Sequence, residues 1–188
     1  ATWKYRDDGQ DPGTEWHTVS FDDSKWKAGP ARLGYGENNE KTRLDFGKDA
    51  KKKYAACYFR HAFELSRWIE FGDLELKILA DDSAIVYLNG KQAARLRMPD
   101  GAVDHQTYSG IQIKKENVFD KIRIPGNLLQ PGTNLLAVVV HQQRADSSDL
   151  TFDLDLTPLT SPRVIPRPDK GAVNAEAETK WTAIAAQI

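Results

Sequence analysis

A single cysteine stands in the 188-residue sequence, and this scarcity excludes two kinds of site. Cys57 alone cannot form an intramolecular disulfide, and it cannot build a cysteine-based zinc cluster. No evident His or Asp partner accompanies it, so we expect Cys57 to be a small buried hydrophobe. The four histidines are widely separated and form no closely spaced pair of metal ligands.

An excess of basic residues is also missing. The formal net charge is −1, which argues against nucleic acid or an anionic membrane surface as a partner. The longest apolar runs, such as residues 135–140, are far shorter than a bilayer span, so we expect no transmembrane segment. No signal peptide is present, and the strand-like opening at Ala1 suits a mature or trimmed N-terminus.

Familiar catalytic motifs are absent from the sequence. It contains no Gly-x-Ser-x-Gly elbow, no glycine-rich phosphate loop opening a helix, and no His-Glu-x-x-His metal site. No nucleophile stands at a recognisable spacing from a base. We therefore expect a protein that is not an enzyme and requires no cofactor.

What the sequence does contain is strand and turn signals. A strand pattern runs directly into Asn89-Gly90, the dipeptide that favours a type I′ hairpin turn because both of its residues tolerate positive φ. Other strand patterns follow at short spacing, at residues 58–65, 74–78, 121–124, 134–142 and 151–156. Many short strands separated by turns predict an all-β protein, a two-sheet antiparallel β-sandwich.

The domain organisation follows from a change of composition after Leu159. We assign residues 1–159 to one β-sandwich and residues 160–188 to a proline-rich tail, extended at first and then helical. This tail leads to a further domain or packs on the sandwich. Residues 37–53 are polar and charged, and we expect them to form a mobile loop.

Two neighbouring acids are candidates for a metal site. Asp81 and Asp82 lie at a strand break, where short acidic side chains often cap backbone N–H groups. Loop carboxylates can instead hold a structural calcium ion. Adjacent residues of a strand point to opposite faces, so the two acids cannot jointly flank a scissile bond.

Polar residues around the end of the strand at 134–142 are candidates for sugar binding. Asp149, with His141 and Arg144, would hydrogen-bond the hydroxyl groups of a saccharide. The same segment, Asp146-Ser-Ser-Asp149, would equally satisfy a tight loop through Asx and Ser turns.

Aromatic residues carry the second indication of binding. Trp68, Tyr35 and Tyr108 are candidates for an exposed ring that stacks on a pyranose, and packing in the protein is the alternative for each. We expect Trp16 and Trp26 to lie in the core or at its edge.

Taken in order, several motifs resemble a known family. They are Phe21-Asp-Asp-Ser-Lys-Trp26, Leu33-Gly-Tyr-Gly36, Ala80-Asp-Asp82, Val86-Tyr-Leu-Asn-Gly90, Asn134-Leu-Leu-Ala-Val138 and Ser147-Ser-Asp149. Together they resemble a galactose-binding-like jelly-roll accessory domain of secreted bacterial multidomain enzymes. This type of domain is similar to carbohydrate-binding modules and to the sugar-binding-type domain of glycoside hydrolase family 2.

The resemblance implies a domain without catalysis of its own, in a protein that is secreted, extracellular or periplasmic. Its partners would be a polysaccharide or glycan and a catalytic domain of the same parent chain. The alternative is a structural or protein-interaction domain that packs against a catalytic neighbour, such as a metallophosphoesterase or glycosidase, and binds no sugar. The lysine-rich stretch at residues 48–53 and the insertion around Trp68 depart from the family pattern.

Overall fold

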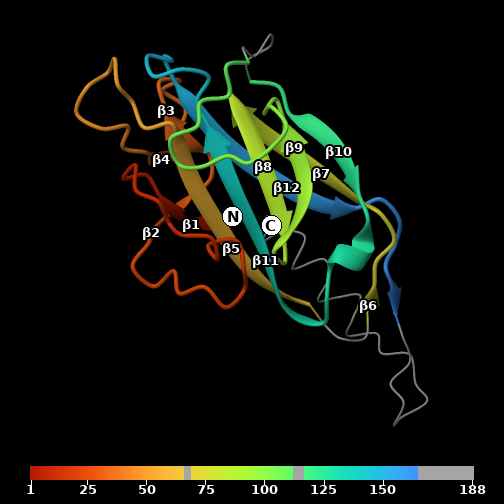
Figure 1. Cartoon of the computed structure of the whole chain (residues 1–188). Coiled ribbons are helices and arrows are strands. Elements are labelled where there is room, and N and C mark those ends of the chain that lie inside the picture. Colours follow the sequence, from red (N-terminus) through yellow and green to blue (C-terminus); the bar gives the residue numbers. More distant parts are fainter. Residues whose placement is uncertain (66–68, 112–116, 165–188) are drawn as a thin grey trace.

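Strands with alternating apolar residues form two sheets that face each other across one core (Figure 1). The computed structural model of the chain describes residues 1–65, 69–111 and 117–164. Within these residues the first sheet has the order β2-β1-β5-β11-β8-β9, and the second has the order β10-β7-β12-β3-β4. All neighbouring strands pair antiparallel except β3 and β4, which pair parallel. The predicted two-sheet β-sandwich is confirmed.

The strands of the first sheet are β1 (Thr2–Arg6), β2 (Lys27–Pro30), β5 (Ala56–Leu65), β8 (Ser83–Leu88), β9 (Lys91–Leu96) and β11 (Gly132–His141). Those of the second are β3 (Leu33–Tyr35), β4 (Thr42–Arg43), β7 (Leu74–Asp81), β10 (Asp120–Ile124) and β12 (Leu150–Pro158). A short ribbon pairs β6 (Ile69–Glu70) with β13 (Arg163–Val164), and a 3-10 turn, η1 (Gly126–Leu128), precedes β11. No helix in this described part of the chain has the length and hydropathy needed to cross a membrane.

The core lies between the sheets and follows from the period of two along each strand. In β12, Phe152, Leu154 and Leu156 point inward, as their alternation predicts, and each is at most 2% exposed. The Phe152 ring stacks on Phe59 of β5, with 4.2 Å between ring centroids, and joins the two sheets. Cys57 is buried in the same core, as expected.

The first sheet is buried on its outer face as well. The connection between β1 and β2, residues 7–26, crosses this face, and we call it the N-terminal loop (red to orange in Figure 1). Trp16, Phe21 and Trp26 of this loop pack against outward residues of β5, β8 and β11. Because both faces of β11 are covered, its sequence is a continuous apolar run.

Two expectations about local structure have different outcomes. The Asn89-Gly90 hairpin is confirmed, because these two residues join β8 to β9 with φ of 52° and 81°. Residues 37–53 are more ordered than a polar mobile loop. They contain β4, and the side chains of Leu44 and Lys53 are buried. The backbone N–H of Lys53 donates to the Ala145 carbonyl at 2.9 Å.

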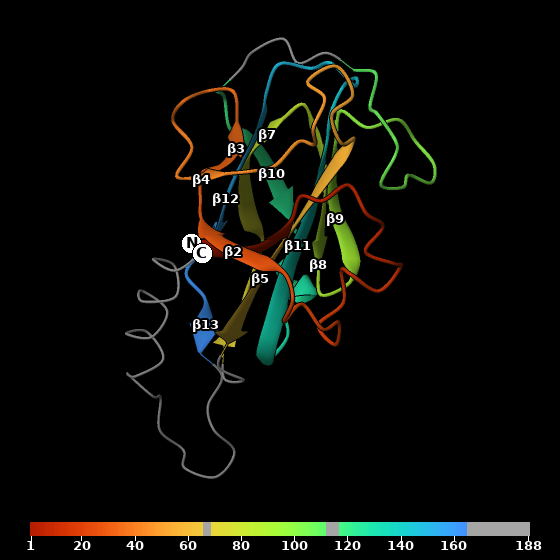
Figure 2. The same cartoon turned by 90° about the vertical axis from the view of Figure 1, so that its left-hand side faces the viewer.

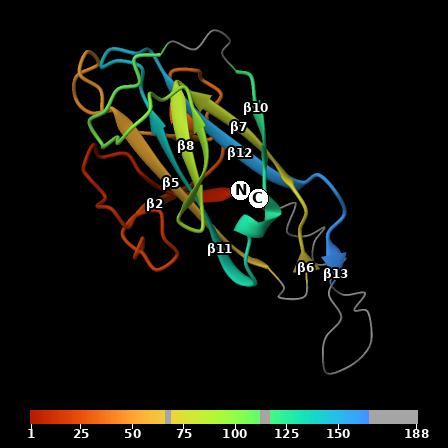
Figure 3. The ribbon, with the colours of Figure 1, turned by 45° about the vertical axis from the view of Figure 1, so that its right-hand side comes forward.

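Most of the predicted tail, residues 165–188, lies outside the described residues. The short ribbon of β6 and β13 precedes it, at the end of the sandwich opposite the long loops (Figure 3). The division of the chain at residue 159 stays a prediction.

Candidate functional site

Most of the predicted site residues meet at one end of the sandwich, which we call the loop end (uppermost in Figure 2). It is formed by the end of β3, the junction of β7 with β8, and residues 97–111 and 142–149. These segments carry Tyr35, Asp81, Asp82, Tyr108, His141, Arg144 and Asp149. The sequence motifs therefore identified residues that are neighbours in space.

Asp82 acts inside the protein at this end. Its carboxylate is 3% exposed and accepts hydrogen bonds from the Gln143 backbone N–H at 2.6 Å and the Ser147 hydroxyl at 3.2 Å. It therefore holds the 142–149 loop, which is the capping role expected of an acid at a strand break. Asp81 is also buried and pairs with Thr151 of β12 in the strand ladder.

The predicted calcium ion has no set of acidic ligands around it in the described residues. Among them no three His, Cys, Asp or Glu side chains are grouped so that they could hold a metal ion. Calcium at Asp81 and Asp82 stays a prediction, which would need backbone carbonyls as further ligands.

Burial corrects the prediction for Tyr35 and His141. Tyr35 is 3% exposed, and its hydroxyl accepts a hydrogen bond from the Gln142 amide, so its ring cannot stack on a sugar from solvent. His141 is 1% exposed, and its Nδ1 lies 2.8 Å from the Thr107 carbonyl. Burial lowers the pKa of His141, so the ring is neutral and donates from Nδ1 to that carbonyl.

Asp149 is buried too, and its carboxylate accepts a hydrogen bond of 2.6 Å from the neighbouring Ser148 hydroxyl. This contact matches the loop-turn alternative for the Asp146-Ser-Ser-Asp149 segment. A saccharide would have to displace buried contacts of this kind to reach Asp149.

Tyr108 and Arg144 are the two predicted residues that remain at the surface of the loop end. Their segments lie side by side, because the N–H groups of Ser109 and Gly110 donate to the carbonyls of Gln142 and Gln143. The Tyr108 ring is 37% exposed while its hydroxyl donates to the Lys53 carbonyl at 2.8 Å. Arg144 pairs with Asp146 at 2.7 Å. The remaining candidate, Trp68, lies outside the described residues.

A pocket that the sequence analysis missed lies beside the first sheet, and we call it the side pocket. It has a volume of about 320 Å³ and opens between β1, β2 and the N-terminal loop. The described residues that line it are Tyr5, Arg6, Asp7, Asp8, Phe21, Asp22, Lys25, Trp26 and Lys27. Aromatic rings and charged groups of both signs thus converge on one hollow.

Ion pairs organise the charged wall of the side pocket. Arg6 Nε lies 2.9 Å from Asp8 Oδ1, and Lys27 Nζ lies 2.8 Å from Asp7 Oδ1. Burial alone would raise the pKa of Asp8, but hydrogen bonds from Arg6 and the Gln10 backbone together lower it. The hydrogen bond to Asp7 raises the pKa of Lys27, so Lys27, like Asp8, stays charged at neutral pH.

Arg60 positions the aromatic wall from beneath. This buried side chain of β5 donates to Asp23 Oδ2 at 2.8 Å and to the carbonyls of Trp16, Thr18 and Phe21. Its guanidinium also lies 5.1 Å from the Phe21 ring centroid and 6.0 Å from that of Trp26. Hydrogen bonds from Arg60 therefore tie the N-terminal loop to the sheet. The sequence does contain a signal for this contact. It is an arginine at an outward position of a strand, between Tyr58 and Ala62.

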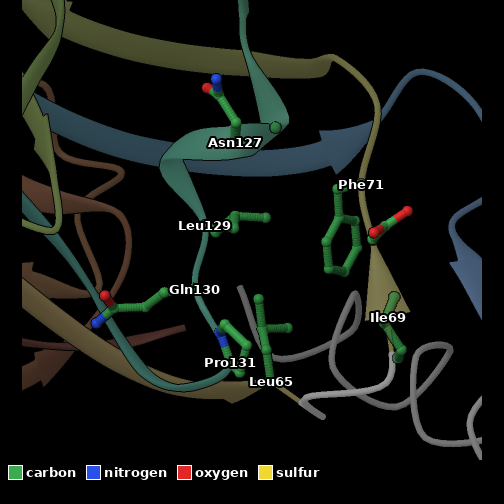
Figure 4. A pocket seen from close by; sticks show the side chains of 9 residues that line it. Leu65, Ile69, Phe71, Asn127, Leu129, Gln130 and Pro131 are labelled. Carbon is green, nitrogen blue, oxygen red and sulfur yellow. The ribbon is translucent and has the colours of Figure 1, made fainter. Parts of the chain in front are cut away.

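A second hollow, about 400 Å³ in volume, lies at the end that carries β6 and β13 (Figure 4). We call it the apolar hollow. The described residues lining it are Leu65, Ile69, Glu70, Phe71, Gly126, Asn127, Leu129, Gln130 and Pro131. Ile69 pairs with Val164 in the β6–β13 ribbon, so β13 lies beside this hollow.

Comparisons with solved structures find similarity to parts of glycosidases. The sequence matches no protein-family profile and no curated protein. The chain is similar to part of a β-glucuronidase from Bacteroides uniformis, with 19% identity and a TM-score of 0.49, over 88% of this chain and 16% of that one. It is also similar to part of a β-glucuronidase from Bifidobacterium dentium, with 18% identity and a TM-score of 0.46, over 75% of this chain and 19% of that one. For a β-glycosidase from Bacteroides vulgatus the values are 15% identity and a TM-score of 0.47, over 82% of this chain and 19% of that one.

Proposed function

We propose that this chain is a non-catalytic carbohydrate-binding module, which holds an enzyme of the same parent chain on a polysaccharide or surface glycan. The side pocket is the observation that supports this most, because half-buried aromatic rings adjoin ionised side chains in it. An aromatic ring packs against the C–H groups of a pyranose, and charged side chains form strong hydrogen bonds with its hydroxyls. The proposal includes a secreted or periplasmic location.

The side pocket suits a ligand better than the loop end does. At the loop end, Asp82, His141 and Asp149 already bond to neighbouring groups and are buried. A ligand would have to break those bonds, and a buried polar group left without a partner costs about 1–3 kcal/mol. In the side pocket, Asp22 and Lys25 are exposed and accessible to a ligand.

The test is affinity electrophoresis of the full chain through gels that contain plant, algal or microbial polysaccharides. We expect at least one polymer to retard the chain, and Trp26→Ala to weaken its affinity about tenfold, or about 1.4 kcal/mol. The matched control is Tyr108→Ala, which removes an exposed ring at the loop end and should leave the affinity unchanged. Melting curves establish that both variants are folded.

Other outcomes would contradict parts of the proposal. Loss of retardation in Tyr108→Ala, with Trp26→Ala unaffected, would move the sugar to the loop end. Retardation by no polymer would contradict carbohydrate binding. The same gels run with calcium or with a chelator test the metal, and an unchanged melting temperature in chelator would contradict the structural calcium ion at Asp81 and Asp82.

A structural role is the second candidate, and the apolar hollow favours it. A hollow lined by Leu65, Phe71 and Leu129 is suited to an apolar side chain of a packed neighbour, such as a metallophosphoesterase or glycosidase domain. In that case the parent protein would melt in one transition. Leu129→Asp would separate it into two, while no polysaccharide would retard the chain.

A further inference from the structure

The side pocket is lined by positive and negative side chains in equal number. Its described lining carries the cations Arg6, Lys25 and Lys27 and the carboxylates Asp7, Asp8 and Asp22. Arg6 is paired with Asp8, and Lys27 is paired with Asp7. Both carboxylate oxygens of Asp7 accept hydrogen bonds, because the second one accepts from the Asp45 backbone N–H at 2.7 Å. The pocket therefore holds ion pairs and no cluster of free cations.

The remaining cation, Lys25, is exposed, and its positive charge acts on the carboxylate of Asp22. A hydrogen bond from the Ser24 backbone N–H lowers the pKa of Asp22, and the positive charge of Lys25 lowers it further. Asp22 is therefore ionised at neutral pH and offsets the charge of Lys25. A uronate or sulfate entering the pocket would meet the negative charges of Asp8 and Asp22, and it would have to compete with Asp8 and Asp7 for Arg6 and Lys27.

A neutral hydroxyl group meets no such conflict. It can donate to the carboxylate of Asp8 or Asp22 and accept from Lys25 or Arg6, so each hydroxyl is satisfied in both roles. The rings of Phe21 and Trp26 stand edge to face at 5.8 Å, and Arg60 holds them from below. They give the apolar face of a sugar ring a rigid wall.

We propose that the side pocket binds a neutral, hydroxyl-rich saccharide and rejects saccharides that carry carboxylate or sulfate groups. This inference rests on the proposed carbohydrate-binding function and narrows its ligand. The ionised, exposed carboxylates of Asp8 and Asp22 would discriminate between these saccharides, since they attract hydroxyl donors and repel anions.

The experiment compares two polymers that differ mainly in charge, polygalacturonate and its methyl ester, together with neutral galactan, glucan and xylan. The full chain should be retarded by a neutral polymer and not by polygalacturonate. Raising NaCl from 0.05 to 0.5 M should change the affinity less than twofold, because a neutral ligand has no charge to screen. Asp8→Asn and Asp22→Asn should each weaken neutral binding at least fivefold. Asp100→Asn, which changes an exposed carboxylate outside the pocket lining, is the control and should not.

The failures are distinguishable. Retardation by polygalacturonate that falls steeply with salt would overturn this inference and leave the carbohydrate-binding function standing. Neutral binding that survives both pocket variants at full strength would overturn the assignment to this pocket. Retardation by none of the polymers would overturn the carbohydrate-binding function as well.

Discussion

Asn89 and Gly90 turn the chain between β8 and β9 because both residues adopt left-handed φ, at 52° and 81°. A β-branched residue occupies that region at high cost, whereas asparagine tolerates it. Space is not the limit here, because a Cβ on Gly90 would meet no atom closer than 3.8 Å. The backbone conformation alone decides which residue fits.

Gly90→Val should therefore lower the free energy of unfolding by at least about 1 kcal/mol through backbone strain. Urea denaturation of the full chain measures the loss. Gly90→Asn is the matched control and should cost clearly less. Equal stability of the valine variant and the original chain would contradict the turn assignment.

Arg60 has a role that the strand pattern around it does not predict. Alternation predicts an outward side chain at this position of β5, and an outward arginine normally reaches solvent. The N-terminal loop folds over it, so Arg60 is buried and its donors bond to loop carbonyls and Asp23. Its role depends on a segment about forty residues earlier in the chain.

At the scale of elements, β3 and β12 approach each other too closely for a side chain at one position. A Cβ on Gly34 would lie 2.2 Å from the backbone carbonyl oxygen of Leu150. Backbone cannot move aside as a flexible side chain can, so the two strands would have to separate locally. Gly34 belongs to the Leu33-Gly-Tyr-Gly36 motif, and this close approach is the structural reason for a glycine there.

Gly34→Ala should accordingly destabilise the chain by about 2 kcal/mol or more, because it forces apart the edge pairing of β3 with β12. Guanidinium denaturation measures the change. Gly72→Ala is the comparison, since among the described residues its Cβ would meet only the Thr160 hydroxyl, at 2.9 Å, which can rotate away. If the Gly34→Ala variant is as stable as Gly72→Ala, the backbone of β12 can move away from the added Cβ, and the prediction is wrong.

At the scale of the whole molecule, the buried His141 and the half-buried His61 link stability to pH. Burial lowers the pKa of His141 and of His61 from the ordinary value of 6.5. Around His141 the Thr107 carbonyl and Asp104 act in the opposite direction, and Arg95 adds to the lowering. The folded chain therefore binds fewer protons than the unfolded chain when the pH falls below 6.5.

We expect the free energy of unfolding to change little between about pH 8 and pH 7 and to fall as the pH drops from 6.5 toward the folded pKa values of these histidines. Urea denaturation at pH 7.5, 6.5 and 5.5 measures it, and His61→Asn should reduce the slope. Carboxylates with lowered pKa, such as Asp8, act in a separate window below about pH 4. Stability that rises on acidification from pH 7.5 to 5.5 would contradict the assignment of neutral buried histidines.

The amino-acid sequence by itself determined the β class, the Asn89-Gly90 hairpin and the inward residues of β12. These features depend on period-two alternation and on turn residues, which act over a few neighbouring positions. It also indicated that His141, Arg144 and Asp149 belong together.

Only the tertiary structure decided which of these groups are accessible. Tyr35 and His141 are buried because loops from other parts of the chain close over the loop end. The side pocket exists because β1, β2 and a loop tied to Arg60 of β5 meet at one place. Accessibility and convergence depend on contacts between segments far apart in the chain, and local patterns do not encode those contacts.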